Sequence, residues 1–308
     1  KSQAIRYIGD KSNANTDSAL VATKRSLIFN ELNKELYRKF FMNRSELQAC
    51  KDGYIYIHDQ SARLDTMNCC LFDVAAVLKD GFEMGNVWYN EPKTLDTAFD
   101  VMGDIILSTA AQQYGGFTVP EVDKILAPYA KKSYDRYIEE FMQYSDPSWV
   151  GREEKAIERA LDKVRRDYDQ GWQGIEYKLN TVGSSRGDYP FVTVTLGLGT
   201  GQFEKMCSMS LLAVHKGGQG KEGHKKPVLF PKIVFLYDEK IHGKGKSCED
   251  VFEAGVDCSS KTMYPDWLSI VRQGIYCQYV QTVRKGDQPY GVSCFPEPMV
   301  RKRRYVSC

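Results

Sequence analysis

The chain has 308 residues, enough for one large domain or two ordinary ones, and its 42% hydrophobic and 27% charged residues are typical of a soluble globular protein. No apolar run approaches the roughly 20 residues that a membrane helix needs, so we expect no membrane association. The net charge of +2 is uneven. Residues 270–308 hold seven basic and two acidic residues, so the first 269 carry −3, and this mildly acidic body gives no support to nucleic-acid binding.

The nine cysteines predict a reducing environment. An odd count, without a visible secretion signal, is typical of reduced thiols in a cytoplasmic protein. Cys69 and Cys70 are the only pair close in sequence, and no Cys-x-x-Cys spacing occurs. We therefore expect no metal site in this chain.

Hydrophobic periodicity and turn residues divide the chain into helices and strands. In chain order, the sequence predicts a helix at 20–41, a strand at 54–57, an apolar segment of either kind at 69–78, helices at 94–113, 121–144 and 152–177, a strand at 191–196, a helix at 204–215, a strand at 231–236 and a helix at 249–262. Asp17 or Ser18 is the expected cap of the first helix. Strands alternate with long helices, so the fold class is α/β.

The glycine- and lysine-rich loop at 216–226 is a solvated loop in the favoured interpretation. It lacks the Gly-x-x-x-x-Gly-Lys-Ser/Thr pattern of a phosphate-binding loop. The polar loop from Asn180 to Phe191 leads into a strand, as ligand-binding loops of α/β proteins do. An ordinary helix-to-strand connection explains it equally well.

Chemistry alone leaves the candidate catalytic residues undecided. Most buried cysteines are inert small hydrophobes, and this interpretation of Cys69 is favoured over a catalytic thiol. His58 and Asp59 would form an acid–base pair if their side chains met. Adjacent strand residues point to opposite faces, however, so a turn or capping role is favoured.

Seven short motifs occur in order along the first 269 residues. They are Asn13-Ala14-Asn15-Thr16-Asp17, Tyr56-Ile57-His58-Asp59, Met67-Asn68-Cys69-Cys70, Gly115-Gly116-Phe117-Thr118-Val119-Pro120, the loop from Asn180 to Phe191, the segment 226–232 and Tyr264-Pro265-Asp266. Each is modest alone. Together they resemble the catalytic domain of the class III, or anaerobic and oxygen-sensitive, ribonucleoside-triphosphate reductases, which are glycyl radical enzymes.

The resemblance implies a fold and an activity. Residues 1–269 would form the first part of a ten-stranded α/β barrel of the ribonucleotide reductase and glycyl radical enzyme type. The activity would be the anaerobic reduction of ribonucleoside triphosphates to deoxyribonucleoside triphosphates by glycyl and thiyl radical chemistry. Cys69 aligns with the cysteine that helps to remove the 2′-hydroxyl. The implied substrate-binding residues are Asn68, His58, Asp59, Ser184, Ser185 and Arg186.

The resemblance also implies cofactors and partners. The family uses a glycyl radical near its C-terminus, a structural zinc in its C-terminal region, dNTP and ATP as effectors and, in many members, formate as the reductant. A radical-SAM iron–sulfur enzyme installs the radical. We expect a homodimer that forms through the long helices after Thr94, with no membrane and no nucleic-acid partner.

The resemblance stops after Ser269, where the family's finger-loop motif, similar to Ser-Pro-Met-Gly-Cys-Arg, is expected. The codons for residues 279–308, read one base later, permit MYKQYGKVISPMGCRAFLSPWYEKGGMYP, which contains this motif. The pair Met299-Val300 forces the Trp in that string. We therefore interpret residues 270–308 as an out-of-frame tail. The Met two places before the cysteine in the shifted string resembles the formate-using subtype.

The out-of-frame interpretation has a mechanistic consequence. Cys277, Cys294 and Cys308 would be products of the shifted frame and not the thiyl cysteine. The chain as written would then lack the finger-loop cysteine, the radical glycine and the ATP-binding cone, and we expect it to be inactive alone. Two alternatives stay open: another glycyl radical enzyme, such as a lyase or dehydratase, and a non-enzymatic binding protein that uses the basic residues at 301–304.

Overall fold

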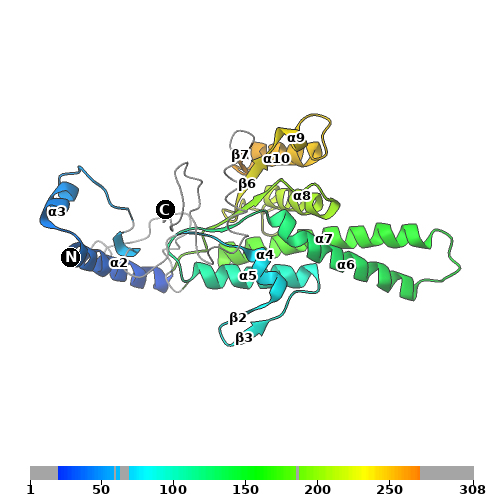
Figure 1. Ribbon diagram of the computed structural model, residues 1–308, viewed down its shortest axis with the longest axis horizontal. Coiled ribbons are helices and arrows are strands. Elements are labelled where there is room, and N and C mark those ends of the chain that lie inside the picture. Colours follow the sequence, from blue (N-terminus) through cyan, green and yellow to red (C-terminus); the bar gives the residue numbers. More distant parts are fainter. Residues whose placement is uncertain (1–19, 59, 63–68, 185–186, 271–308) are drawn as a thin grey trace.

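The computed structural model describes residues 20–58, 60–62, 69–184 and 187–270. The elements in chain order are α2 (Val21–Phe41), α3 (Arg44–Lys51), η1 (Gln60–Ala62), β1 (Cys70–Leu71), α4 (Val74–Asp80), β2 (Phe82–Met84), β3 (Val87–Tyr89), α5 (Leu95–Ala110), β4 (Phe117–Val119), α6 (Val122–Tyr144), α7 (Arg152–Thr181), β5 (Val192–Leu196), α8 (Gln202–Gly217), β6 (Lys232–Tyr237), α9 (Glu239–His242), α10 (Glu249–Lys261) and β7 (Asp266–Ser269). Figure 1 shows their arrangement.

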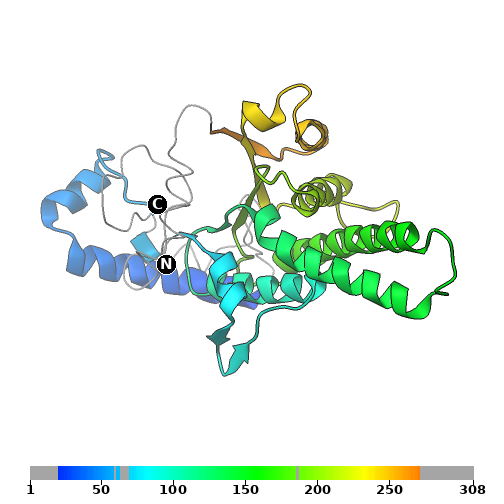
Figure 2. The ribbon, with the colours of Figure 1, turned by 45° about the vertical axis from the view of Figure 1, so that its right-hand side comes forward.

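Five strands form one parallel sheet in the order β1-β4-β5-β6-β7. The strands β2 and β3 form a separate antiparallel hairpin. The strand order follows the chain order without a reversal. Because parallel crossovers are almost always right-handed, such an order places the crossover helices on one face of the sheet. Figures 1 and 2 show α6, α7 and α8 together on the same side. The predicted α/β class is confirmed.

The core is centred on the long helix α7. Trp172 and Tyr168 are fully buried in it, and Phe99 of α5 packs edge-on against both, with ring centroids 5.1 Å and 6.2 Å away. Gly171 lies directly against the Phe99 ring, and a Cβ atom here would overlap with it. The absence of a side chain at this position lets the two helices pack closely.

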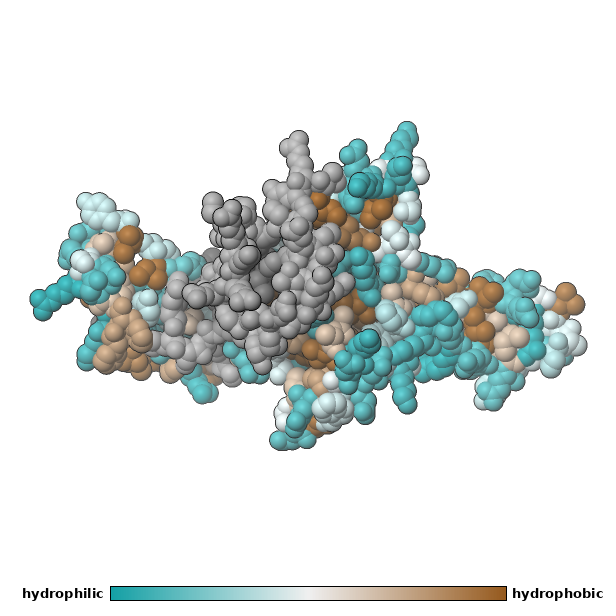
Figure 3. Space-filling model, in the orientation of Figure 1, coloured by the Kyte–Doolittle hydropathy of each residue, from teal (hydrophilic) through white to brown (hydrophobic). Residues whose placement is uncertain are grey.

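The arm formed by α2 and α3 exposes apolar side chains. Phe40 and Phe41 at the end of α2 are 67% and 65% exposed, and Tyr54 and Tyr56 after α3 are 84% and 86% exposed. Figure 3 shows brown and tan residues over this arm, at the left of the view. The predicted strand at 54–57 is therefore wrong: these residues have no strand assignment, and a strand exists only where a neighbouring strand pairs with it.

Most of the other predicted elements are confirmed. The six predicted helices and the strands at 191–196 and 231–236 are present with small differences at their ends. The undecided segment 69–78 contains both kinds of structure, the strand β1 and the start of α4. Leu20 is the N-cap of α2 and makes no side-chain cap bond, while Asp17 and Ser18 lie outside the described residues. None of the described helices is long and apolar enough to cross a membrane.

A buried carboxylate joins α6 to the end of β5. Asp123 is completely buried, and its Oδ2 accepts hydrogen bonds from the backbone N–H groups of Gly197 at 3.0 Å and Gly199 at 3.1 Å. Burial raises the pKa of Asp123 from 3.8 to about 6, although the bonds to Gly197 and Gly199 oppose the shift. Asp123 is therefore a source of pH-dependent stability.

The packing at Gly171 gives a testable prediction. Gly171→Ala should lower the free energy of unfolding by about 1–3 kcal/mol, because the new methyl group overlaps with the Phe99 ring. Gly174→Ala is the matched control, since no atom lies within 4 Å of the added Cβ in the same helix, and it should be neutral or stabilise by up to about 1 kcal/mol. Urea unfolding measures both. Equal midpoints for the two variants would contradict the packing described here.

The environment of Asp123 predicts how stability depends on pH. Below about pH 4 both folded and unfolded chains hold the Asp123 proton, whereas between about pH 4 and 6 only the folded chain holds it. Stability contributed by this group is thus lost as pH rises, by about 3 kcal/mol from pH 3.5 to 7. Asp123→Asn cannot titrate, so its unfolding free energy relative to wild type should rise over this range. A difference independent of pH would refute the assignment.

Candidate active site

A glycine turn fixes the backbone around the two adjacent cysteines. Gly116 lies between α5 and β4, where its carbonyl accepts a hydrogen bond from the Cys70 N–H at 2.9 Å. The Gly116 N–H donates to the Sγ of Cys69 at 3.3 Å. One glycine therefore sets both the start of the β1–β4 pairing and the hydrogen bonding of the Cys69 sulfur.

Cys69 and Cys70 occupy different environments although they are neighbours. Cys69 is half-buried, whereas Cys70 is 2% exposed and its thiol donates to Oε1 of Gln113 at 3.0 Å. Burial raises the pKa of Cys70 to about 12. At neutral pH Cys70 is therefore a protonated thiol, and Cys69 is the chemically available member of the pair.

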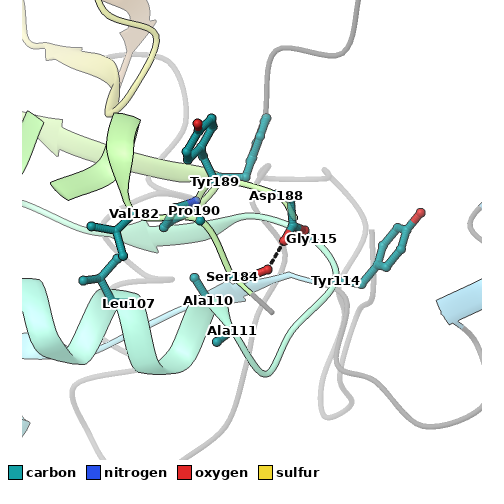
Figure 4. A pocket seen from close by; sticks show the side chains of 12 residues that line it. Leu107, Ala110, Ala111, Tyr114, Gly115, Val182, Ser184, Asp188, Tyr189 and Pro190 are labelled. Carbon is teal, nitrogen blue, oxygen red and sulfur yellow. Dashed lines mark hydrogen bonds between the residues drawn. The ribbon is translucent and has the colours of Figure 1, made fainter. Parts of the chain in front are cut away.

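A pocket of about 270 Å³ opens beside this turn, between the C-terminal end of α5 and the loop that precedes β5. Its lining residues are Leu107, Ala110, Ala111, Tyr114, Gly115, Val182, Gly183, Ser184, Asp188, Tyr189, Pro190 and Phe191. In Figure 4, Leu107 and Ala110 lie opposite Val182 and Pro190, which makes one side of the pocket apolar. Cys69 is not itself a lining residue, but Gly115 lines the pocket and the next residue, Gly116, contacts the Cys69 sulfur, so we place the thiol at the pocket margin.

The polar side of the pocket is a short hydrogen-bonded loop. The Ser184 N–H donates to the Asp188 carbonyl at 2.7 Å, and the Ser184 hydroxyl donates to the Asp188 carboxylate (Figure 4). Gly187 has φ +83°, and a Cβ there would overlap with Thr23 of α2, whose hydroxyl donates to the Gly187 carbonyl at 3.0 Å. A glycine is therefore required at 187, and α2 holds the loop in place.

The structure brings together only some of the residues expected from the sequence. Ser184 lines the pocket and Cys69 lies at its margin. His58 is exposed in the segment after α3, where its ring packs edge-on against Tyr56, and it is not a lining residue. The remaining expected residues lie outside the described part of the chain: Asp59, Asn68, Ser185 and Arg186.

Two polar contributors to the site were not expected. Gln113 is 1% exposed, and its Nε2 donates to the Gly115 carbonyl at 3.1 Å while its Oε1 accepts from Cys70. Asp188 lay in the loop singled out in the sequence but had no assigned role. Within the described residues, no group of three or more His, Cys, Asp or Glu side chains can hold a metal ion.

The structure is an α/β protein with a five-stranded parallel sheet and a thiol directly before its first strand, and comparison with known proteins gives its family. The family model for anaerobic ribonucleoside-triphosphate reductases matches residues 12–293. The chain therefore belongs to this family. The matched range extends 24 residues beyond Ser269.

Known relatives agree with this assignment. The chain is 34% identical over 260 residues to the anaerobic ribonucleoside-triphosphate reductase of Enterobacteria phage T4, covering 83% of this chain and 41% of that protein. It is 33% identical over 286 residues to the Escherichia coli K12 protein of the same name, covering 92% of this chain and 38% of that one. The chain thus spans about two fifths of the length of these relatives.

Solved structures share the fold. The anaerobic ribonucleotide reductase from Thermotoga maritima, in complex with dATP and CTP, aligns with a TM-score of 0.54 and 14% identity over 82% of this chain and 41% of that one. This likeness confirms the expected fold, the first part of the reductase α/β barrel.

The two cysteine environments predict unequal reactivity. A thiol with a pKa of about 12 is only ~10⁻⁴ ionised at pH 8, so iodoacetamide should leave Cys70 unmodified while it alkylates Cys69. Cys50, which is half-buried on α3, serves as the internal reference for a reacting thiol. Fragment-ion mass spectrometry separates the adjacent sites. Comparable labelling of Cys69 and Cys70 would show that Cys70 is not held as described.

Proposed function

We propose that this chain is part of an enzyme that reduces ribonucleoside triphosphates to deoxyribonucleoside triphosphates under anaerobic conditions. The observation that carries the proposal is the Cys69 thiol, which accepts a backbone hydrogen bond at the margin of a pocket in a chain of this family. Removing a 2′-hydroxyl requires a proton donor close to the ribose, and Cys69 is the available thiol at this position.

The pocket suits the ribose end of a nucleotide better than its triphosphate. Its volume of about 270 Å³ is below that of most complete ligand sites. Its described lining contains the acidic Asp188 and no Lys or Arg, and a triphosphate requires cations. Ser184 and Asp188 provide hydrogen-bonding groups of the kind that bind sugar hydroxyls. The same role is proposed for Asn68, His58, Asp59, Ser185 and Arg186 from their motifs alone.

The proposed reaction is balanced with formate as the reductant. Ribonucleoside triphosphate, formate and a proton give deoxyribonucleoside triphosphate, carbon dioxide and water, and formate loses the two electrons that the sugar gains. The glycyl radical of the family supplies the one-electron oxidation that starts the reaction. In this chain, Cys69 donates its proton to the departing 2′-hydroxyl, and the Gly116 N–H stabilises the sulfur as its charge increases.

The proposed partners and cofactors follow the family. They are a radical-SAM iron–sulfur activating enzyme, dNTP and ATP effectors, a structural zinc in the family's C-terminal region and a second copy of the chain. The related Thermotoga protein binds dATP and CTP, which supports nucleotide effectors and substrates. The described cysteines are free thiols, which supports the cytoplasm as the compartment.

A homodimer through the long helices has one supporting observation. The tip of the α6–α7 hairpin extends away from the sheet (Figure 1) and exposes Tyr144, Trp149 and Val150, at 80%, 46% and 92%. Aromatic and apolar side chains of this kind are typical of protein interfaces. We propose that this hairpin takes part in the contact with the second copy.

We also propose that residues 1–269 form the native barrel segment and that 270–308 is out of frame. The proposal is supported by the codons for residues 279–308, which, when read one base later, permit a sequence that contains Ser-Pro-Met-Gly-Cys-Arg. The family match continues across the proposed junction to residue 293 and therefore does not locate the shift. The DNA sequence across the junction is the direct test. The match to the reductase family favours this activity over a lyase, a dehydratase or a non-enzymatic binding protein.

The test combines DNA sequence and activity. Sequencing the codons near Ser269 should show that a one-base change restores Ser-Pro-Met-Gly-Cys-Arg. The corrected full-length enzyme, activated anaerobically, should then convert ribonucleoside triphosphates to deoxyribonucleoside triphosphates with formate, and Cys69→Ala should lower kcat at least about 10³-fold. Cys50→Ala is the control and should retain activity. An active Cys69→Ala enzyme would exclude the proposed proton donor, and a corrected wild type without reductase activity would exclude the proposed function.

A further inference from the structure

We propose that Gln113 is a positioning residue for Cys69, which it orients through the peptide group between Gly115 and Gly116. The proposal deepens the proposed function, since it rests on Cys69 as the working thiol. Gln113 itself is 1% exposed and is not a lining residue of the pocket. Gln113 therefore acts on the site indirectly, through hydrogen bonds that connect it to Cys69.

One planar group links Gln113 to the sulfur of Cys69. The Gly115 carbonyl accepts from Gln113 Nε2 at 3.1 Å, and the N–H of the same peptide bond, on Gly116, donates to Cys69 Sγ at 3.3 Å. A trans peptide bond is planar, with its C=O and N–H pointing in opposite directions. Fixing the carbonyl therefore fixes the direction of the N–H that reaches the sulfur.

The other end of the Gln113 amide is anchored by Cys70. The Cys70 thiol donates to Gln113 Oε1 at 3.0 Å, so the amide is held at both of its ends. The Gly115 carbonyl can only accept, which places the amide nitrogen on that side and leaves the oxygen for the thiol. Burial keeps Cys70 in the protonated form that this bond requires.

The two glycines of this turn make the peptide plane between them free to rotate unless another group holds it. Gly115 and Gly116 have no side chains to limit rotation of the peptide plane between them, and glycine is the most conformationally free residue. The Gly116 carbonyl is fixed by the Cys70 N–H at 2.9 Å, but that carbonyl belongs to the following peptide bond. Gln113 holds the preceding peptide, whose N–H donates to Cys69.

A hydrogen bond donated to sulfur stabilises the thiolate more than the thiol. Gln113→Met keeps the length of the side chain and removes both hydrogen bonds, so the peptide plane is released. The alkylation rate of Cys69 by iodoacetamide at pH 7.5 should fall about threefold to tenfold in this variant. Gln112→Met is the matched control: Gln112 is exposed, bonds only locally to the Ser108 carbonyl at 3.3 Å, and its replacement should leave the rate unchanged.

The measurement uses the full chain and separates positioning from general loosening. Cys207 and Cys248 are 0% exposed and report whether the core stays closed. Slower labelling of Cys69 with both buried cysteines still protected supports the proposal. An unchanged rate at Cys69 with the same protection overturns it.

A second pair of variants decides the matter if Gln113→Met opens the core. Cys70→Ser keeps a donor for Gln113 Oε1, whereas Cys70→Ala removes it. The Cys69 rate should fall in Cys70→Ala and be rescued in Cys70→Ser, and equal rates in the two overturn the proposal. No radical is needed for this measurement, so a lack of reductase activity would refute the proposed function without changing this result.

Discussion

Each crossover in the main sheet adds the next strand on the same side of the previous one, and this constraint positions the helices and the site. A strand order that follows the chain, combined with right-handed connections, puts the crossover helices on one face. The starts of β1, β4 and β5 then lie side by side, because parallel strands share one polarity. Cys69, Gly116 and the loop with Ser184 precede these three strand starts. The site is therefore a product of the sheet's winding as much as of its motifs.

The six longer helices could be predicted from the sequence because their signal is local, whereas the short helices α3 and α9 were not predicted. A helix pairs its own backbone, so apolar spacing within the segment is sufficient, and α6 and α7 were found within a few residues of their ends. Strands depend on a partner. The run at 54–57 resembles a strand in sequence but has no partner strand, whereas β4, only three residues long after two glycines, was not predicted. β7 and the β2–β3 hairpin were missed for the same reason.

The site divides in a similar way. Cys69 and Ser184 were found because they lie in motifs of the family. Chemistry alone would have left the roles of these two residues undecided. The apolar wall from α5 could not be predicted, since helical spacing does not say which loop a helix end will face. Gln113 was missed because neither of its partners gives a sequence signal. One is a backbone carbonyl, that of Gly115, and the other is the thiol of Cys70, which is distant in sequence. The difference between Cys69 and Cys70 likewise comes from tertiary burial.

The contact between Phe99 and Gly171 also determines where α7 stands along its own axis. A slip of four residues, about 6 Å, would bring Asp167 or Ile175 beneath the ring, and neither side chain leaves the space that glycine provides. The helix is thereby prevented from sliding against α5. The helix α7 ends at Thr181, three residues before Ser184. The Phe99 ring therefore fixes the position along the α7 axis at which the pocket loop begins.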